Sequence, residues 1–298
     1  MAWAELSDCR CYYELLGNGE PLILIPGLAA TSRMWDPIAA DLAQFFSVIL
    51  FDNRGIGQSV AKRVPTSLSD MVSDIVELLD HLQVDRAHVL GISLGGIIAQ
   101  HVAIDHPTRV HRLVLASCAD TFSPYLRQMS MFMAHTLRRF PREMFVRTME
   151  LLGTAPEFLD ANVDLVEQRV KSKCRTSISA RAVGNQLRCL ASSEIEPMHF
   201  RISAPTLVMA GEFDPIIPSC YARQMAEKIP NSEFYLVKGA GHNPIVDHPE
   251  RCLPKVIEFL SHTRSIDDEN KTEGMDCYIP YFGGYLPRLE VVHGGDGS

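Results

Sequence analysis

The 298-residue sequence lacks the features that would direct a chain to a membrane or to an oxidising compartment. No apolar run reaches the roughly 18 residues that a transmembrane helix needs. The first residues contain neither a basic segment nor a long apolar stretch, so we expect no signal peptide. The eight cysteines are scattered without a C-x-x-C pair, which predicts reduced, mostly buried thiols and no metal site. We therefore expect a cytoplasmic protein with no membrane partner.

Positive charge is also scarce. The chain has 28 Lys and Arg residues and 36 Asp and Glu residues, which gives a net charge of −8. No cluster of basic residues with interleaved aromatics occurs, so nucleic acid is not an expected partner. A hydrophobic content of 46% and a charged content of 21% are typical of a globular protein, and the length suits one large domain or a domain with an insertion.

Buried strands and amphipathic helices alternate along much of the chain. Apolar strand-like runs lie at residues 21–26, 46–51, 87–92, 112–117, 205–211 and 233–237. The helical periodicity of residues 68–82 falls between two of them. This alternation predicts an α/β fold with a mostly parallel sheet covered by helices on both faces. Residues 10–15 and 21–26 are expected to form an antiparallel hairpin across Gly17-Asn18-Gly19.

Further along, Asp52 and Arg54 are expected to hold a tight turn together, because Gly55-x-Gly57 lacks the third glycine of a nucleotide-binding loop. The alternation stops at about residue 120 and resumes near residue 205. We therefore predict a core of residues 1–120 and 201–262, and a helical lid of residues 121–200 over the sheet edge. The tail, 263–298, combines a polar segment with an aromatic one, and its docking, disorder or role in a homodimer stays open.

The stretch Gly91-Ile-Ser93-Leu-Gly95-Gly96 is the most informative in the chain. It follows the strand-like run 87–92 and precedes the apolar helical run 97–104, which is the context of the G-x-S-x-G turn that presents a nucleophilic serine. Small residues are needed there because side chains at positions 91 and 95 would collide with the strand and the helix. The helix N-terminus would favour negative charge on the Ser93 oxygen.

An acid and a histidine follow two later strands. Asp214 comes just after the run 205–211, and His242 lies in a glycine-rich loop after the run 233–237. The carboxyl ends of parallel strands meet at one sheet edge, so Ser93, Asp214 and His242 can converge. His242 would accept the serine proton, and Asp214 would orient the imidazole. Asp120, which also follows a strand, is the competing acid.

This chemistry needs two hydrogen-bond donors for the oxyanion of the tetrahedral intermediate, and it needs neither a metal nor a cofactor. The backbone N–H groups of Leu28 and Leu94 are the candidates. Apolar residues of the lid and of the strand-end loops are candidates for the substrate pocket, although any one of them can instead join the lid to the core. The pocket candidates are Trp35, Met129, Met133, Phe213 and Ile216.

The chain resembles the serine hydrolases of the α/β-hydrolase fold over roughly residues 10–262. The shared motifs are Pro26-Gly27, the loop from Asp52 to Ser59, the Ser93 turn, Gly211-Glu-x-Asp214 and Gly241-His242. Within that fold, Arg33-Met-Trp-Asp-Pro37 and Ile92-Ser-Leu-Gly-Gly96 are similar to 3-oxoadipate enol-lactonases and related esterases. The serine at position 93 argues against the epoxide hydrolases and haloalkane dehalogenases, which use an aspartate nucleophile.

The sequence therefore predicts a serine hydrolase that cleaves an ester or lactone of a small, mainly apolar molecule through an acyl-enzyme on Ser93. Three alternatives remain open at this point. The same triad could cleave a carbon–carbon bond, the chain could be a ligand receptor that does not turn over its ligand, or the pocket could carry out acyl transfer or cyclisation.

Overall fold

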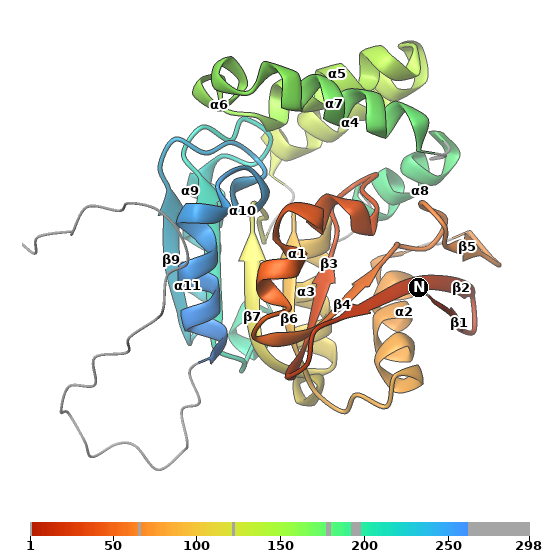
Figure 1. The fold of residues 1–298 in the computed structure, drawn as a ribbon, viewed down its shortest axis with the longest axis vertical. Coiled ribbons are helices and arrows are strands. Elements are labelled where there is room, and N and C mark those ends of the chain that lie inside the picture. The colour runs from red at the N-terminus through yellow and green to blue at the C-terminus, as the bar shows by residue number, and fades with distance from the viewer. Residues whose placement is uncertain (1, 65–66, 121–122, 177–179, 192–197, 262–298) are drawn as a thin grey trace, which may run out of the picture. The chain divides into compact units, whose positions relative to one another are not determined.

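One sheet of nine strands forms the centre of the protein in a computed structural model that describes residues 2–64, 67–120, 123–176, 180–191 and 198–261 (Figure 1). The strands are β1 (Ala2–Glu5), β2 (Cys9–Leu16), β3 (Glu20–Ile25), β4 (Phe46–Phe51), β5 (Val60–Ala61), β6 (Ala87–Ile92), β7 (Val110–Ala116), β8 (Thr206–Gly211) and β9 (Ser232–Val237). Their order across the sheet is β1-β2-β4-β3-β6-β7-β8-β9, and β5 pairs with β2. The strands from β4 to β9 in this order are parallel, whereas β1, β2 and β5 pair antiparallel, which confirms the predicted mostly parallel sheet.

The expected hairpin between β2 and β3 is wrong. Strand β4 lies between them, antiparallel to β2 and parallel to β3. Gly17 and Gly19 have φ angles of 76° and 143°, and a Cβ on either would lie within 2.6 Å of a backbone oxygen at the start of β4. Because the glycines have no side chains, the segment between β2 and β3 can pass close to the backbone at the start of β4. It does not form a two-residue hairpin turn.

Alternating residues of the central strands face two separate hydrophobic clusters. In β3, Ile23 and Ile25 pack towards one cluster, and Leu22 and Leu24 pack towards the other. Helices α2 (Leu68–His81), α3 (Leu94–Asp105) and α9 (Ser219–Lys228) contribute to the first cluster. Helices α1 (Asp36–Leu42), α10 (Pro244–Asp247) and α11 (Pro249–Ser261) contribute to the second. Strands buried on both faces explain the continuous apolar runs of the sequence.

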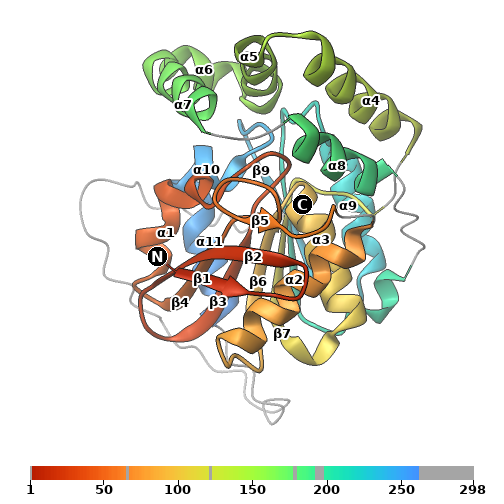
Figure 2. The same ribbon diagram turned by 90° about the vertical axis from the view of Figure 1, so that its right-hand side faces the viewer.

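A helical insertion separates the neighbouring strands β7 and β8. Its helices are α4 (Pro124–Arg139), α5 (Arg142–Gly153), α6 (Pro156–Ala161), α7 (Val163–Arg175) and α8 (Ala180–Ala191). In both ribbon views these helices, here called the cap, lie beyond the carboxyl ends of the parallel strands (Figures 1 and 2). Residues 121–122 and 192–197 lie outside the described residues, so the predicted lid limits stay predictions. The tail, 263–298, also lies outside them.

The Asp52 loop is built differently from the expectation. Arg54 does not pair with Asp52, but donates from Nε and from Nη2 to the Asp74 carboxylate of α2, at 2.5 and 2.6 Å. Asp52 instead accepts the backbone N–H groups of Ser32 and Gln58, at 2.7 and 2.8 Å. Each charged side chain therefore anchors the loop to a different segment. Among the described helices, none combines the length and the apolar character needed to cross a bilayer.

Candidate active site

Ser93 lies in a strained turn between β6 and α3. Its φ and ψ are 56° and −122°, a backbone conformation that residues other than glycine rarely adopt. A Cβ on Gly91 would lie 2.3 Å from the oxygen of Gly95, and a Cβ on Gly95 would lie 2.1 Å from the oxygen of Ile25. The glycines are therefore required for α3 to pack directly against β3 and β6. The predicted turn around Ser93 is present at the sheet edge beneath the cap, and the role of Ser93 as a nucleophile stays a prediction.

The structure brings Ser93, His242 and Asp214 together. His242 Nε2 lies 2.9 Å from Ser93 Oγ, and His242 Nδ1 lies 2.7 Å from Asp214 Oδ2. The other oxygen of Asp214 accepts the backbone N–H groups of Ile216 and Ile217, at 2.9 and 3.0 Å. The Asp214 side chain is fully buried. These hydrogen bonds therefore stabilise its negative charge and determine the orientation of its carboxylate. This arrangement favours the His242 tautomer with the proton on Nδ1, which leaves Nε2 free to accept the serine proton.

Asp120, the competing acid, serves a different cluster. Its carboxylate forms an ion pair with Lys228 of α9 and lies 3.9 Å from His199 Nδ1. His199 Nε2 in turn lies 3.0 Å from Gln100 Oε1 in α3. Because Asp214 occupies the hydrogen-bonding position at His242, Asp120 is not the partner of the candidate catalytic histidine.

The two candidate oxyanion donors belong to residues that line the same cavity as Ser93. Leu94 is the first residue of α3, and Leu28 belongs to the loop after β3. Both residues line the same cavity as Ser93 and His242. Loops from two different strands thus border the space where a substrate carbonyl would lie, and the role of their N–H groups remains a prediction.

A cavity of about 1,280 Å³ lies between the cap and the edge of the sheet. Three of the pocket candidates line it, namely Met129 and Met133 of α4 and Ile216 of the core, and their contact with a substrate stays a prediction. Much of the remaining lining from the cap is apolar and includes Leu126, Leu137, Phe145, Val146 and Met149. Apolar walls around a few convergent polar groups are typical of a site for a small organic molecule.

The comparison with known proteins decides the family. The sequence matches the alpha/beta hydrolase fold family over residues 20–249. The chain belongs to this family. A curated relative, the "Putative carbamate hydrolase RutD" of Azorhizobium caulinodans, is 28% identical over 242 residues, which are 81% of this chain and 91% of the relative. These matches confirm the resemblance at the level of the α/β-hydrolase fold.

Solved structures agree with this assignment. A hydrolase from Pseudomonas aeruginosa PA01 superposes with a TM-score of 0.80 at 28% identity and covers 88% of this chain and 98% of its own. The enol-lactonase from Burkholderia xenovorans LB400 superposes with a TM-score of 0.79 over 88% of this chain and 100% of its own. Its identity of 20% shows a shared fold alone. The closer likeness to 3-oxoadipate enol-lactonases therefore stays a prediction.

Two predicted pocket residues of this α/β-hydrolase do not line the cavity. Trp35 is fully buried in the core cluster with Ile38 and Leu42, where its large apolar ring fills the space under α1. Phe213 is 49% exposed and lies outside the cavity lining. Position after a strand end identified the correct region of the sheet, but it did not determine in which direction each aromatic ring points.

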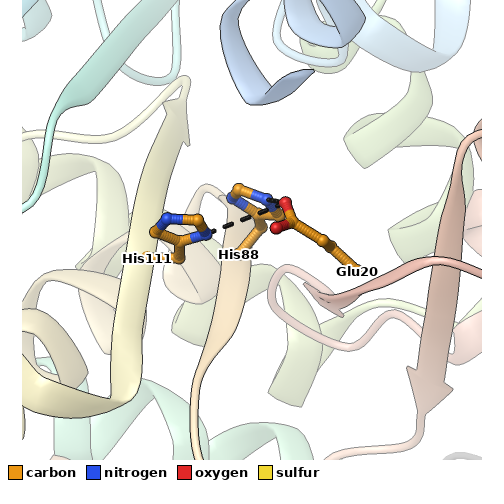
Figure 3. Close-up of side chains that lie close together, drawn as sticks. All are labelled: Glu20, His88 and His111. Atoms are coloured by element: carbon orange, nitrogen blue, oxygen red, sulfur yellow. Dashed lines mark hydrogen bonds and ion pairs between the residues drawn. The ribbon is translucent and has the colours of Figure 1, made fainter. Parts of the chain in front are cut away.

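A second histidine cluster lies at the opposite edge of the sheet. Glu20, His88 and His111 come from the starts of β3, β6 and β7, and their ligand-type atoms lie within 4.8 Å of one another (Figure 3). The two imidazoles are stacked, with centroids 4.7 Å apart and planes at 24°. His88 Nε2 lies 2.9 Å and His111 Nδ1 lies 3.8 Å from the same carboxylate oxygen of Glu20. The cluster therefore contains a histidine stack held by one carboxylate, and the absence of a metal site stays a prediction.

Two contacts between the cap and the strand-end loops could not be predicted from the sequence. The carbonyl of Gly153, at the end of α5, accepts the His242 N–H at 2.8 Å. The side chain of Gln186 in α8 accepts the Ala29 N–H at 3.0 Å. Neither residue belongs to a recognisable motif, and both contacts join segments far apart in the chain, so only the fold reveals them.

Proposed function

We propose that this α/β-hydrolase is a serine hydrolase of esters or lactones. The observation that carries the proposal is the continuous hydrogen-bonded chain from Ser93 Oγ through His242 to Asp214. In the acylation step, His242 Nε2 takes the proton of Ser93 as Oγ attacks the substrate carbonyl carbon. The same proton then passes to the leaving alcohol as the carbon–oxygen bond breaks.

The oxyanion of the tetrahedral intermediate is proposed to accept hydrogen bonds from the N–H groups of Leu28 and Leu94. Water then attacks the acyl carbon while His242 takes a proton from it. The bond between that carbon and Ser93 Oγ breaks, the proton passes from His242 to Oγ, and the acid is released. The buried Asp214 carboxylate stabilises the imidazolium that forms in each step. Every step uses groups of the chain and water, so the proposal requires no metal and no cofactor.

The lining of the cavity supports an apolar substrate. Methionines of α4 and isoleucines of the Asp214 loop line the same cavity as Ser93, and flexible methionine side chains can adapt to varied apolar shapes. The charged side chains of the lining include ion pairs such as Arg169 with Asp247 and Lys173 with Glu150. A mainly apolar ester or lactone therefore suits the cavity better than a strongly charged substrate.

Replacement of the nucleophile tests the proposal directly. We expect Ser93→Ala to lose labelling by a fluorophosphonate probe and to lose ester hydrolysis by about a thousandfold or more. Ser130→Ala is the matched control, because Ser130 is a buried serine that lines the same cavity from the cap. Retention of full esterase activity by the Ser93→Ala protein would rule out the mechanism.

A substrate panel separates the alternatives that share the same site. Purified protein is assayed with aryl esters, lactones and β-diketones, and with an added alcohol as an acyl acceptor. Faster turnover of the diketones would indicate carbon–carbon bond hydrolysis, and transfer to the alcohol would indicate an acyltransferase. Tight binding with turnover below about one event per hour would indicate a receptor, given ordinary enzyme rates.

A further inference from the structure

The loop that follows β3 contains a residue in a strained conformation. Ala29 has a φ of 57°, in the left-handed region where an alanine is disfavoured. The same loop is held from one side by Asn53, whose Nδ2 donates to the carbonyl of Pro26 at 3.3 Å. Its own Ala30 N–H bonds back to Gly27 O at 3.3 Å. These two long bonds alone do not fix the N–H of Ala29, which lies between them.

A cap residue accepts that N–H. Gln186 Oε1 lies 3.0 Å from the Ala29 nitrogen, across 157 positions of sequence. Gln186 is 1% exposed, and its helix α8 packs Val183 and Leu187 against Ile56 of the core. Only the carbonyl oxygen of the amide can accept from an N–H, so the donor fixes the orientation of the Gln186 side chain.

The position of this contact links it to the chemistry. Ala29 directly follows Leu28, whose N–H is the proposed oxyanion donor. Rotation of the backbone at Ala29 would redirect the peptide groups next to it. The penalty of a left-handed alanine and the net contribution of one hydrogen bond are of similar size, so a single bond can decide which conformation the loop adopts.

We propose that Gln186 is a positioning residue for the oxyanion loop, holding Ala29 in its left-handed conformation so that the Leu28 N–H faces the substrate oxygen. The inference rests on the proposed function, because it assigns Leu28 a role in the hydrolysis. It makes the cap part of the catalytic scaffold as well as a wall of the cavity. Gln186 itself lies outside the cavity lining, and it acts only through the loop.

Gln186→Met tests the inference, because methionine has a similar length but no carbonyl acceptor. We expect kcat for a short ester to fall by about tenfold to a hundredfold, while KM changes little. The decrease should not exceed the decrease in kcat that follows the complete removal of one oxyanion donor. Asn185→Ala is the matched control, because Asn185 is a neighbouring buried amide of α8 that bonds to Arg188 in the same helix. The control should keep its kcat.

A suppressor variant separates positioning from simple stability. Glycine adopts positive φ without strain, so Ala29→Gly should recover several-fold of the kcat lost in Gln186→Met. Loss of activity in proportion to the unfolded fraction, no recovery by Ala29→Gly, or an unchanged kcat in Gln186→Met would each overturn the inference. Should Gln186→Met fail to fold, Gln186→Asn, which is too short to reach Ala29, takes its place with the same criteria.

Hydrogen exchange gives a readout that does not depend on turnover. In a Ser93→Ala background, Gln186→Met should speed exchange of the Ala29 amide by about tenfold or more, and Asn185→Ala should not. Unchanged exchange would show that Gln186 does not hold the loop. Esterase activity retained by Ser93→Ala alone would instead contradict the proposed function, so the two failures are distinguishable.

Discussion

Gly95 shows how strictly single residues determine the nucleophile turn. Its missing Cβ would lie 2.1 Å from the carbonyl oxygen of Ile25, which is fixed in the central strand β3. Gly95→Ala should therefore push α3 away from the sheet, lower the unfolding free energy by about 1–3 kcal/mol and reduce the rate of Ser93 labelling. Urea unfolding and fluorophosphonate kinetics measure the two effects.

Gly184→Ala is the matched control for that substitution. Gly184 lies inside helix α8, and a Cβ there would meet nothing within 4 Å. Alanine is the better helix former, so this variant should gain about 0.5–1 kcal/mol. Equal stability of both variants would show that the contact at Ile25 does not constrain the turn.

At the same scale, the sequence predicted the residues that are marked by local chemistry. Ser93 directly follows a strand, and Asp214 and His242 lie in the short loops after two others, next to small or turn-forming residues, so a short window identifies them. Gln186 and the Asp74 partner of Arg54 stand in ordinary helical windows. Their roles depend on which distant segment lies opposite, and no local pattern encodes that.

At the scale of elements, an ion pair joins the cap to helix α10, which begins two residues after His242. Arg169 of α7 donates to Asp247 of α10 at 2.6 Å, and the Asp247 side chain is 1% exposed. Burial raises the pKa of Asp247, against the opposing effect of Arg169 and with a further increase from Glu150. Asp247 lies five residues after His242 in the chain. Its buried carboxylate therefore depends on Arg169 of the cap for a compensating charge.

Arg169→Met should destabilise the protein by about 3 kcal/mol, because it leaves a buried carboxylate without its partner. Addition of Asp247→Asn should recover part of that loss. Arg147→Met is the control, because Arg147 pairs with Glu143 and Glu167 inside the cap, on the surface, and its removal should change stability little. Urea unfolding of Arg169→Met, Asp247→Asn, the double variant and Arg147→Met measures this coupling. Strictly additive losses in the two single variants and the double variant would contradict it.

The order of the strands shows the limit of sequence reasoning for elements. The existence of β2 and β3 was predicted, but the Gly17–Gly19 segment looked like a hairpin turn because glycines with positive φ also form such turns. The structure uses the same freedom to pass the start of β4. Which strands become neighbours depends on the burial of whole faces, and β3 is buried on both sides between β4 and β6.

At the scale of the molecule, the alternation of buried strands and helices was sufficient to predict the mostly parallel sheet and the helical insertion. The same reasoning predicts how stability depends on pH, because several histidines are buried inside this architecture. Burial lowers the pKa of His88, His101 and His199. His88 is also repelled by its stacked neighbour His111, although its bond to Glu20 partly opposes the decrease (Figure 3).

A lowered pKa in the folded state means that the unfolded chain binds protons first as the pH falls. The unfolding free energy should therefore be nearly constant above about pH 7 and should decrease below about pH 6.5, the ordinary pKa of histidine. Each such histidine contributes a slope of up to about 1.4 kcal/mol per pH unit. Asp74 and Asp247, whose pKa values are raised by burial, act in the opposite direction at lower pH, so the measurement belongs between pH 7.5 and 5.5.

His88→Phe isolates one contribution, because phenylalanine preserves a ring in the stack between Phe46 and His111 but cannot bind a proton. Urea unfolding at pH 7.5, 6.5 and 5.5 should show a shallower loss of stability for this variant than for the unmodified protein. The control is His135→Phe at an exposed position of α4, which should leave the slope as it is. The opposite result is that both variants lose stability with falling pH as steeply as the unmodified protein. That result would show that the acid sensitivity does not arise from the histidine stack at the starts of β6 and β7, and that proton uptake elsewhere in the core causes it.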